Sequence, residues 1–435
     1  MRSRSLFSID ILILLCTLVL IVIGILFIYS SGITSTGVLY SNEYIKQIIW
    51  ATTGLILMMV FAFLNYRLLR DFALYIYLFF VLLLIITLFF GETVNGARSW
   101  IGVWQLGIQP SEFCKIATIL FLAKYLSENT NRIKDVRVFL IALGIILVPV
   151  GLILLQPDMG TALSYIPVFL IMTFIAGAKL RHVLFVFCMG LLTIILAILP
   201  TWETYLLDNP QGFFSILDDS LFIQGGLIVL GSILLLSGLG VYFFKRQYYY
   251  WIMYGDFLLF SGFGFSILAK KFLYDYQIMR LIVFLNPSID PKGSGWNIIQ
   301  SVTAVGSGGF WGKGFLKGTQ SHYRYLPQQS TDFIFSVIAE EWGFVGAFIV
   351  FSLFLIIFIR ALMIMVTARD SIGGYICGGI LAVLFFHFLI NVGMTMGIMP
   401  ITGIPLIFLS YGGSSLWTGL ISIGILMNIY LQRYD

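Results

Sequence analysis

Asp332 is the residue of this sequence whose type and position best suit catalysis. It follows Ser330 and Thr331 at the start of an apolar stretch, within a polar, glycine-rich segment, 295–341, of an otherwise apolar chain. A carboxylate beside basic groups suits a general base that takes a proton from a hydroxyl nucleophile. The alternative is a helix-terminal carboxylate that only complements the helix dipole. The basic residues near it in the sequence are Arg280, Lys292, Lys313, Lys317 and Arg324.

Glu112 and Lys115 form a second charged pair, in the string QPSEFCK. Their i, i+3 spacing places both on one face of a helix, where they can form an ion pair. One interpretation is a charge pair that lines a cavity, in which Lys115 attracts an anion. The other is a structural ion pair between helices, and the sequence leaves both open. Ser111 is expected to cap this helix, and Asp158, in QPDMGTA, is expected to cap another.

Six glycines between 306 and 318 resemble a phosphate-binding loop, but their spacing does not fit the known motifs. A Walker A motif needs glycine five residues before Gly-Lys, where this chain has Ser307, and Ser or Thr after the lysine, where it has Gly314. GxGxxG fails as well, because Trp311 and Lys317 occupy the third-glycine positions. No nucleotide site is expected, and the glycines are expected to permit tight turns or close approach to a ligand.

The composition is that of a membrane protein. Hydrophobic residues make up 60% of the 435 residues, charged residues make up 10%, and the mean hydropathy is +1.00. A soluble domain of this size needs more surface charge. Apolar runs of roughly 20 residues predict helical spans rather than the short alternating strands of a barrel. The cysteines and histidines are spread singly, which predicts neither a disulfide framework nor a metal site, and no nucleic-acid partner is expected.

The apolar runs predict an all-α bundle of about twelve spans in a single transmembrane domain, 1–435. The first run is too long for a signal peptide and has no cleavage site, so we expect a retained span. The short loops on the same side of the membrane as the N-terminus carry fifteen Lys and Arg residues, whereas the short loops and span ends on the opposite side carry three. The positive-inside rule therefore predicts that both termini are cytoplasmic. The expected spans are 11–30, 47–65, 72–90, 112–126, 138–156, 159–177, 183–201, 221–243, 250–269, 333–359, 372–393 and 405–430.

Four polar or glycine- and proline-rich segments then fall on the outer side: 91–111, 156–158, 270–332 and 394–404. Irregular backbone at membrane depth is tolerated only where protein or water satisfies its polar groups. We therefore expect these segments to enclose a shared cavity that opens outward, with Asp332 at its border.

Nine strings, in the same order along nearly the whole chain, resemble the SEDS family of RodA, FtsW and SpoVE, most closely its RodA members. TDFIFSVIAEE and LIFLSYGGSS are the most specific parts of the resemblance. The strings are NGARSWI, QPSEFCK, QPDMGTA, DYQIMR, GSGWNIIQS, GSGGFWGKGF, GTQ, LPQQSTDFIFSVIAEEWG and GIMPITGIPLIFLSYGGSS.

The resemblance implies a peptidoglycan glycosyltransferase of the bacterial cytoplasmic membrane, which polymerises lipid II on the outer face for cell elongation and shape. It implies that Asp332 matches the family's essential aspartate, and that Glu112 and Lys115 match the Glu and Lys of its QPSExxK motif. It also implies a class B penicillin-binding protein, a transpeptidase, as partner. Family members usually have ten spans, so 202–270, with two apolar runs, is expected to be an insertion that leaves the long outer loop 270–332 on the same side.

For this reaction Asp332 would take the proton from the 4-hydroxyl of an acceptor GlcNAc. Diphosphate leaves without full protonation, so one carboxylate could suffice, and a single displacement would invert the anomeric centre. No cofactor is required, although a divalent cation could assist the diphosphate. The candidate substrate-binding residues, of which the first four would stabilise the leaving diphosphate, are Arg98, Lys115, Arg280, Lys313 and Gln320.

Two other functions are weighed against this one. A lipid II flippase would place its substrate near the midplane between symmetry-related broken helices. The sequence shows no internal repeat, and its polar motifs gather on one side instead. A scaffold without catalytic activity would leave the polar segment and Asp332 without a role.

Overall fold

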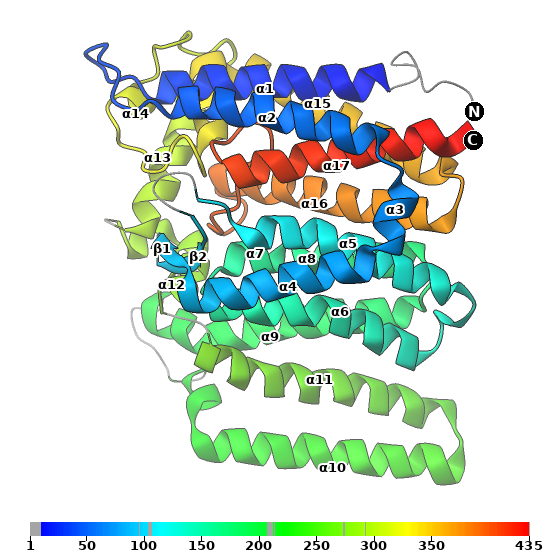
Figure 1. Cartoon of the computed structure of the whole chain (residues 1–435). Helices are drawn as coiled ribbons and strands as arrows, with labels where there is room; N and C mark the ends of the chain where they lie inside the picture. Colours follow the sequence, from blue (N-terminus) through cyan, green and yellow to red (C-terminus); the bar gives the residue numbers. More distant parts are fainter. Residues whose placement is uncertain are drawn as a thin grey trace. The chain divides into compact units, whose positions relative to one another are not determined.

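The structure is a computed structural model that describes residues 10–94, 96–102, 107–206, 212, 214–272, 275–291 and 293–434. Helices dominate it (Figure 1), and ten of those in the described ranges are long and apolar enough to cross a membrane. The fold is the helical bundle of a multi-pass membrane protein, as the composition predicted. The chain divides into two compact units: unit 1 (Met1–Ala178 with Asn297–Asp435) and unit 2 (Lys179–Trp296).

Each of the twelve expected apolar stretches contains a helix. In unit 1 these are α1 (Ile11–Ser31), α2 (Glu43–Phe63), α4 (Ala73–Phe90), α5 (Pro110–Glu128), α6 (Val136–Leu155), α7 (Met159–Leu163) with α8 (Tyr165–Ile175), α15 (Ile334–Thr367), α16 (Ser371–Thr395) and α17 (Gly413–Leu431). In unit 2 they are α9 (Leu180–Leu206), α10 (Ser220–Phe244) and α11 (Gln247–Phe272). The shorter elements are α3 (Tyr66–Asp71), β1 (Glu92–Val94), β2 (Ala97–Trp100), α12 (Asp275–Leu285), α13 (Ser294–Ser307), α14 (Thr319–His322) and the 3-10 turns Thr130–Arg132, Ser215–Asp218, Pro287–Ile289 and Gln432–Tyr434.

The number of spans, about twelve from the sequence, stays a prediction. The ten apolar helices include neither α5 nor the α7–α8 pair. α5 is long enough to cross a membrane, but it carries Glu112, Lys115, Lys124 and Glu128. α7 and α8 together cover only Met159–Ile175.

The last apolar stretch, expected to be a span from 405, becomes helical only at Gly413. The preceding backbone is irregular, with Phe408 at φ 74° and a turn in which Leu406 N donates to Ser410 Oγ at 2.8 Å. Leu406, Phe408 and Leu409 are buried. Their apolar character therefore reflects burial inside unit 1, which is why hydropathy alone misplaced the start of the helix.

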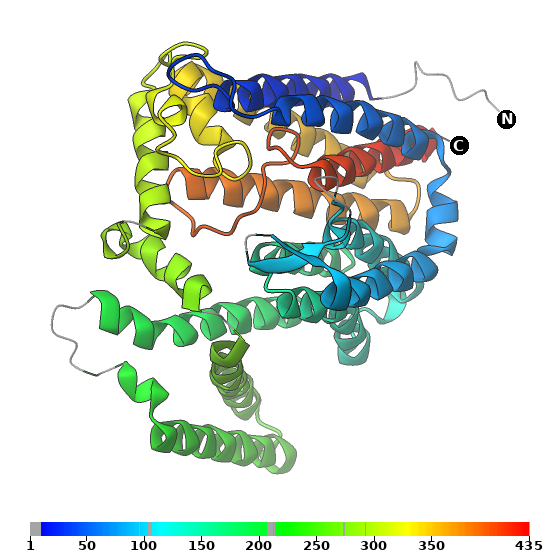
Figure 2. The same ribbon diagram turned by 60° about the vertical axis from the view of Figure 1, so that its left-hand side comes forward.

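Within unit 1, α1, α2, α15, α16 and α17 pack side by side, and α5 and α8 pack against α16 and connect it with α4 and α6 (Figures 1 and 2). α16 and α17 are the most enclosed of the ten apolar helices. Small residues allow close helix approach: a Cβ on Gly424 of α17 would lie 2.4 Å from the Met58 carbonyl oxygen of α2. The core of unit 1 thus centres on α16 and α17.

The two ends of unit 1 hold different parts of the chain. At one end, Arg360 Nε of α15 donates to Asp10 Oδ2 before α1 at 2.8 Å, and the Arg360 guanidinium lies 5.9 Å from the Tyr430 ring of α17. At the other end, Ser35 N, after α1, donates to the His322 carbonyl at 3.1 Å. The start of α1 and the end of α17 therefore share one end, and α14 lies at the other. That the first end faces the cytoplasm stays a prediction from the basic residues.

Unit 2 contains α9, α12 and a helical hairpin formed by α10 and α11. In the hairpin, Gly240 of α10 lies against the Tyr249 ring of α11. α11 also packs on α9, where the Phe185 and Phe257 rings stack with centroids 5.2 Å apart. The hairpin contains both apolar runs of 202–270, and its status as an insertion stays a prediction.

Candidate active site

Asp332 lies in the turn directly before α15 and is partly exposed. Its backbone N–H donates to the Gln328 carbonyl at 3.0 Å, and its carbonyl accepts from Asn391 Nδ2 of α16 at 2.9 Å. Phe333 is the N-cap residue of α15, so Asp332 lies one residue outside the helix. Hydrogen bonds therefore fix its backbone on both sides, at a helix end whose dipole favours a negative charge.

Several of the segments that were expected to share a cavity are joined at this end of unit 1. Gln109 Nε2 donates to Asp158 Oδ2 at 2.7 Å, and Gln109 N donates to Ser414 Oγ at 2.9 Å. Tyr411 N donates to the Ser330 carbonyl at 2.8 Å. These bonds link the segments that precede α5, α7, α15 and α17.

The pair Glu112 and Lys115 lies inside the bundle, and both residues are 3% exposed. Lys115 Nζ donates to Glu112 Oε1 at 2.8 Å and lies 3.0 Å from His387 Nε2 of α16. Thr418 Oγ1 of α17 donates to Glu112 Oε2 at 3.3 Å. His387 Nδ1 lies 3.0 Å from the Pro405 carbonyl. The ammonium is thus enclosed by partners from α5 and α16, a geometry that ties α5, α16 and α17 together.

The two expected helix caps have different outcomes. Ser111 does not cap α5: Gln109 is the N-cap residue, because Pro110 occupies the first helical position, where a missing N–H costs nothing. The Ser111 hydroxyl is buried and has no hydrogen-bond partner among the described residues. Asp158 is the N-cap residue of α7, and its carboxylate accepts from Thr161 N at 3.1 Å and from Thr161 Oγ1 at 2.8 Å.

The glycine-rich segment fills a break in α15. The helix is interrupted at Gly343, where φ is 63° and ψ is −155°. Residues 308–314, called the strap below, lie against this break. Phe344 N, directly after it, donates to the Gly309 carbonyl at 2.9 Å instead of to a carbonyl of its own helix. The strap therefore satisfies backbone groups that the break leaves open.

The glycines of the strap are needed for this backbone contact. A Cβ on Gly308 would lie 1.9 Å from the Ala339 carbonyl oxygen, and one on Gly312 would lie 2.1 Å from the Glu341 carbonyl oxygen. Gly312 also has φ 78°, which favours glycine. The glycines were expected to permit tight turns or close approach to a ligand; at Gly308 and Gly312 they permit close approach of the strap to the backbone of α15.

Glu340 organises the chain that follows the strap. Its fully buried carboxylate accepts from Lys313 Nζ at 2.8 Å and from the backbone N–H groups of Thr319 (2.7 Å), Gln320 (2.9 Å) and Ser321 (3.2 Å). Lys313 also donates to Thr319 Oγ1 at 2.7 Å. Glu340 thus holds two of the candidate substrate-binding residues, Gln320 through its main chain and Lys313 through its ammonium.

Glu341 likewise binds neighbouring segments, including the end of α1. Its carboxylate accepts from Ser30 Oγ and from Leu316 N at 3.0 Å, and lies 3.3 Å from His322 Nε2. His322 Nδ1 lies 2.8 Å from the Ile33 carbonyl. Both neighbours of the ring are acceptors, so the geometry favours the doubly protonated imidazolium. The neighbouring Glu341 carboxylate accordingly raises the pKa of His322.

The remaining basic candidates lie elsewhere. Arg98 is exposed, and its guanidinium donates to the carbonyls of Gly91 (2.9 Å) and Leu88 (3.5 Å) at the C-terminal end of α4, where the helix dipole favours a positive charge. Arg280 belongs to α12 and is described only within unit 2. Lys292 lies outside the described residues.

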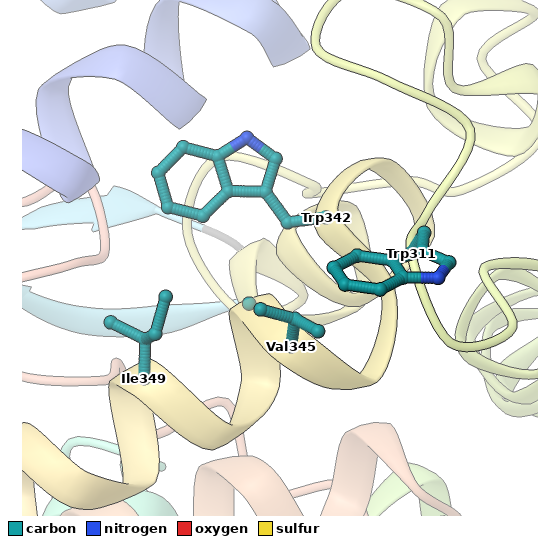
Figure 3. Close-up of a pocket in the computed structure, with 5 residues that line it drawn as sticks. Trp311, Trp342, Val345 and Ile349 are labelled. Atoms are coloured by element: carbon teal, nitrogen blue, oxygen red, sulfur yellow. The ribbon is translucent and has the colours of Figure 1, made fainter.

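An apolar pocket of about 290 Å³ lies beside the break in α15, lined by Trp311, Trp342, Val345, Gly346 and Ile349. In Figure 3 the two indole rings lie on either side of the helix, and Val345 and Ile349 follow along it. Trp311 is 77% exposed. The residues that line the pocket include no charged group, so the pocket suits an apolar chain such as that of a membrane lipid.

His387 and Asn391 were not among the candidates from the sequence. Asn391 Nδ2 donates to the carbonyls of Asp332 (2.9 Å) and Ile404 (2.8 Å), so it contacts the candidate base directly. The signal that could have found these residues is two polar side chains, four positions apart, in an apolar span. Their partners lie far away in the sequence and could not be identified without the fold.

Comparisons with known proteins agree with this architecture. The family model FTSW_RODA_SPOVE, described as cell cycle protein, matches residues 10–233 and 226–435. The chain is 51% identical to peptidoglycan glycosyltransferase RodA of Treponema pallidum (strain Nichols), covering 100% of both chains. It is 33% identical to stage V sporulation protein E of Bacillus subtilis (strain 168), covering 98% of this chain and 97% of the other.

A solved structure, described as structural coordination of polymerization and crosslinking by a peptidoglycan synthase complex, resembles this one with a TM-score of 0.66 at 25% identity. The match covers 98% of this chain and 99% of the other. The family model and the relatives both extend over nearly the whole sequence. The chain therefore belongs to the FtsW/RodA/SpoVE family of membrane proteins.

Proposed function

We propose that this protein is a peptidoglycan glycosyltransferase that polymerises lipid II into glycan strands for cell elongation and shape. The relative at 51% identity over its whole length carries that activity in its name. The observation in the structure that carries the proposal is the placement of Asp332. It is a partly exposed residue with a fixed backbone, at the end of unit 1 where the polar segments meet.

In the proposed reaction, Asp332 is the general base. Its carboxylate takes the proton of the acceptor 4-hydroxyl as that oxygen bonds to the anomeric carbon of the donor sugar. The bond from this carbon to the diphosphate breaks, and polyprenyl diphosphate leaves with the electron pair. One displacement inverts the anomeric centre. A positioned base contributes about 10²- to 10⁴-fold to such a step.

The leaving diphosphate needs positive charge and hydrogen-bond donors. Lys313 suits this role, because it is 26% exposed and is held by Glu340. Gln320 lies on the same held segment, and its side-chain oxygen is buried without a described partner. Arg98 and Arg280 remain candidates. Lys115 is enclosed by Glu112 and His387, which favours the structural interpretation of that ion pair over anion binding.

We place the active site on the outer face of the bacterial cytoplasmic membrane, because the basic short loops assign the opposite side to the cytoplasm. A class B penicillin-binding protein is the proposed partner. It would cross-link the strands that this enzyme makes. The similar solved structure is that of a peptidoglycan synthase complex, which supports a partner of this kind.

The deciding experiment is polymerisation of purified lipid II by the purified full-length protein, with and without the transpeptidase. Asp332→Asn removes the base and should lower the rate by at least about 10²-fold. Asp219→Asn is the matched control, because Asp219 caps α10 and asparagine caps a helix equally well. Full activity of Asp332→Asn would reject the base.

The same preparation separates the alternatives. A flippase would move lipid II across proteoliposomes without making polymer, and a scaffold would do neither. The described residues contain no group of three or more His, Cys, Asp or Glu side chains that could hold a metal ion. Assays with EDTA and with added Mg²⁺ test whether a divalent cation assists the diphosphate.

A further inference from the structure

α16 presents two polar side chains, one helical turn apart, to two consecutive carbonyl groups. His387 Nδ1 faces the Pro405 carbonyl at 3.0 Å, and Asn391 Nδ2 faces the Ile404 carbonyl at 2.8 Å. The same Asn391 nitrogen donates to the Asp332 carbonyl at 2.9 Å. The irregular segment before α17 and the turn before α15 are thereby joined through one side chain.

The amide orientation of Asn391 follows from its neighbours. Asn391 is fully buried, and both of its partners at this end are carbonyl oxygens, which only accept. The NH₂ group must therefore face them, and each of its two hydrogens has an acceptor.

The protonation of His387 is fixed in the same way. The Pro405 carbonyl can only accept, so Nδ1 carries the proton and Nε2 offers its lone pair to the Lys115 ammonium at 3.0 Å. Lys115 is in turn paired with Glu112 at 2.8 Å. The buried ion pair thus selects one tautomer of a neutral imidazole, and that tautomer holds Pro405.

We propose that Asn391 and His387 are positioning residues for catalysis. In this proposal, Asn391 sets the position of the Asp332 backbone directly, and His387, oriented by Lys115, fixes the 404–405 backbone to which Asn391 is also bound. The buried Glu112–Lys115 pair then acts on the reaction from a distance, through α16. This inference rests on the proposed role of Asp332 as the base.

A general base must lie within hydrogen-bond reach of the proton that it removes. Displacing it by about 1 Å can cost about 10²-fold in rate. Loss of the Asn391 bond should therefore lower kcat while the binding of lipid II, and with it KM, changes little. A residue that only stabilises the fold would instead reduce the amount of folded protein.

The chain offers a matched control for this distinction. Asn428 of α17 is also a buried asparagine, and its Nδ2 donates to two main-chain carbonyls, Ala62 at 2.7 Å and Leu64. It lies two residues before Tyr430, at the end of unit 1 that holds Asp10. Asn391→Leu and Asn428→Leu remove the same chemical group from comparable surroundings.

The experiment measures kcat, KM and the thermal unfolding midpoint of both variants in purified full-length protein. Both should unfold at lower temperature. Asn391→Leu should lose about 10²-fold in kcat with KM within about threefold of the wild type, whereas Asn428→Leu should keep kcat within about threefold. A kcat near the wild-type value in folded Asn391→Leu, or equal kcat losses in both variants, would overturn the proposal.

A second pair keeps the test decisive if Asn391→Leu does not fold. In His387→Asn the amide NH₂ can take the place of Nδ1 and donate to Pro405, whereas His387→Leu has no donor. His387→Asn should therefore retain at least about tenfold more kcat than His387→Leu, and equal values would count against the proposal. An active Asp332→Asn would reject the base itself, an outcome distinct from both.

Discussion

The turn at Asp332 and the strap with α14 both lie next to the start of α15, but opposite kinds of group hold them. Around Asp332, neutral donors from α16, Asn391 and His387, bind main-chain carbonyls. Around α14, buried carboxylates of α15, Glu340 and Glu341, bind main-chain N–H groups.

The difference concerns where charge is placed. In the first region the charged groups are the Glu112–Lys115 pair, which does not itself contact the main-chain carbonyls. In the second region carboxylates touch the backbone themselves, and Lys313 and His322 balance them. We infer that the second region responds to pH near neutrality through His322 of α14, whose pKa is raised.

The largest expected contrast is between the two lysines. Lys115→Met leaves the buried Glu112 carboxylate without its cation and should cost about 3–5 kcal/mol of stability. Lys313→Met should cost less, about 1 kcal/mol, because Lys313 is partly exposed and Glu340 keeps its N–H donors. Thermal unfolding of the purified variants measures both.

The control for this contrast is the double variant Glu112→Gln with Lys115→Met. It removes both charges, so it should recover much of the stability that Lys115→Met loses. Equal losses in the two lysine variants would show that burial of the ion pair does not distinguish the regions.

The next effect concerns the strap. Gly312→Ala would place a Cβ 2.1 Å from the Glu341 carbonyl oxygen, at φ 78°, and should cost about 2 kcal/mol or more. Gly306→Ala is the control, because a Cβ there meets nothing within 4 Å. Unfolding midpoints should fall for Gly312→Ala only, and similar midpoints would argue against docking of the strap into the break.

The smallest expected effect is the pH dependence at His322. Because its pKa is raised above 6.5 in the folded protein, the folded state holds the proton more tightly than the unfolded state. The contribution of His322 is fully present below about pH 6.5 and is lost as the pH rises through the raised value. The difference in unfolding midpoint between wild type and His322→Asn should therefore shrink with rising pH, and a constant difference would contradict this.

The helices could be predicted from the sequence because they depend on local composition, whereas the sidedness stays a prediction. All twelve apolar stretches contain helix, and spacing alone suggested the pair of Glu112 with Lys115. The start of α17 was predicted too early, because Phe408 and its neighbours are apolar residues that are buried within the protein outside the helix. The Ser111 cap was wrong, because the helix starts at Pro110, two residues earlier than that cap requires.

The parts of the site that could not be predicted are contacts between distant positions. Lys115 and His387 are separated by 272 residues in the sequence, and nothing local to either indicates the other. Glu340 and Glu341 end the string TDFIFSVIAEE. Their roles depend on a strap that returns to the helix, a tertiary contact that no periodicity encodes.

The break at Gly343 has a consequence for how the protein is made. Synthesis runs from the N-terminus, so residues 308–314 leave the ribosome before Gly343 and the rest of α15 follow. The strap that fills the break is therefore synthesised before the interrupted helix enters the bilayer. Moving the strap downstream of α15 by circular permutation would leave bare peptide groups in the membrane during assembly, a state that lipid cannot solvate.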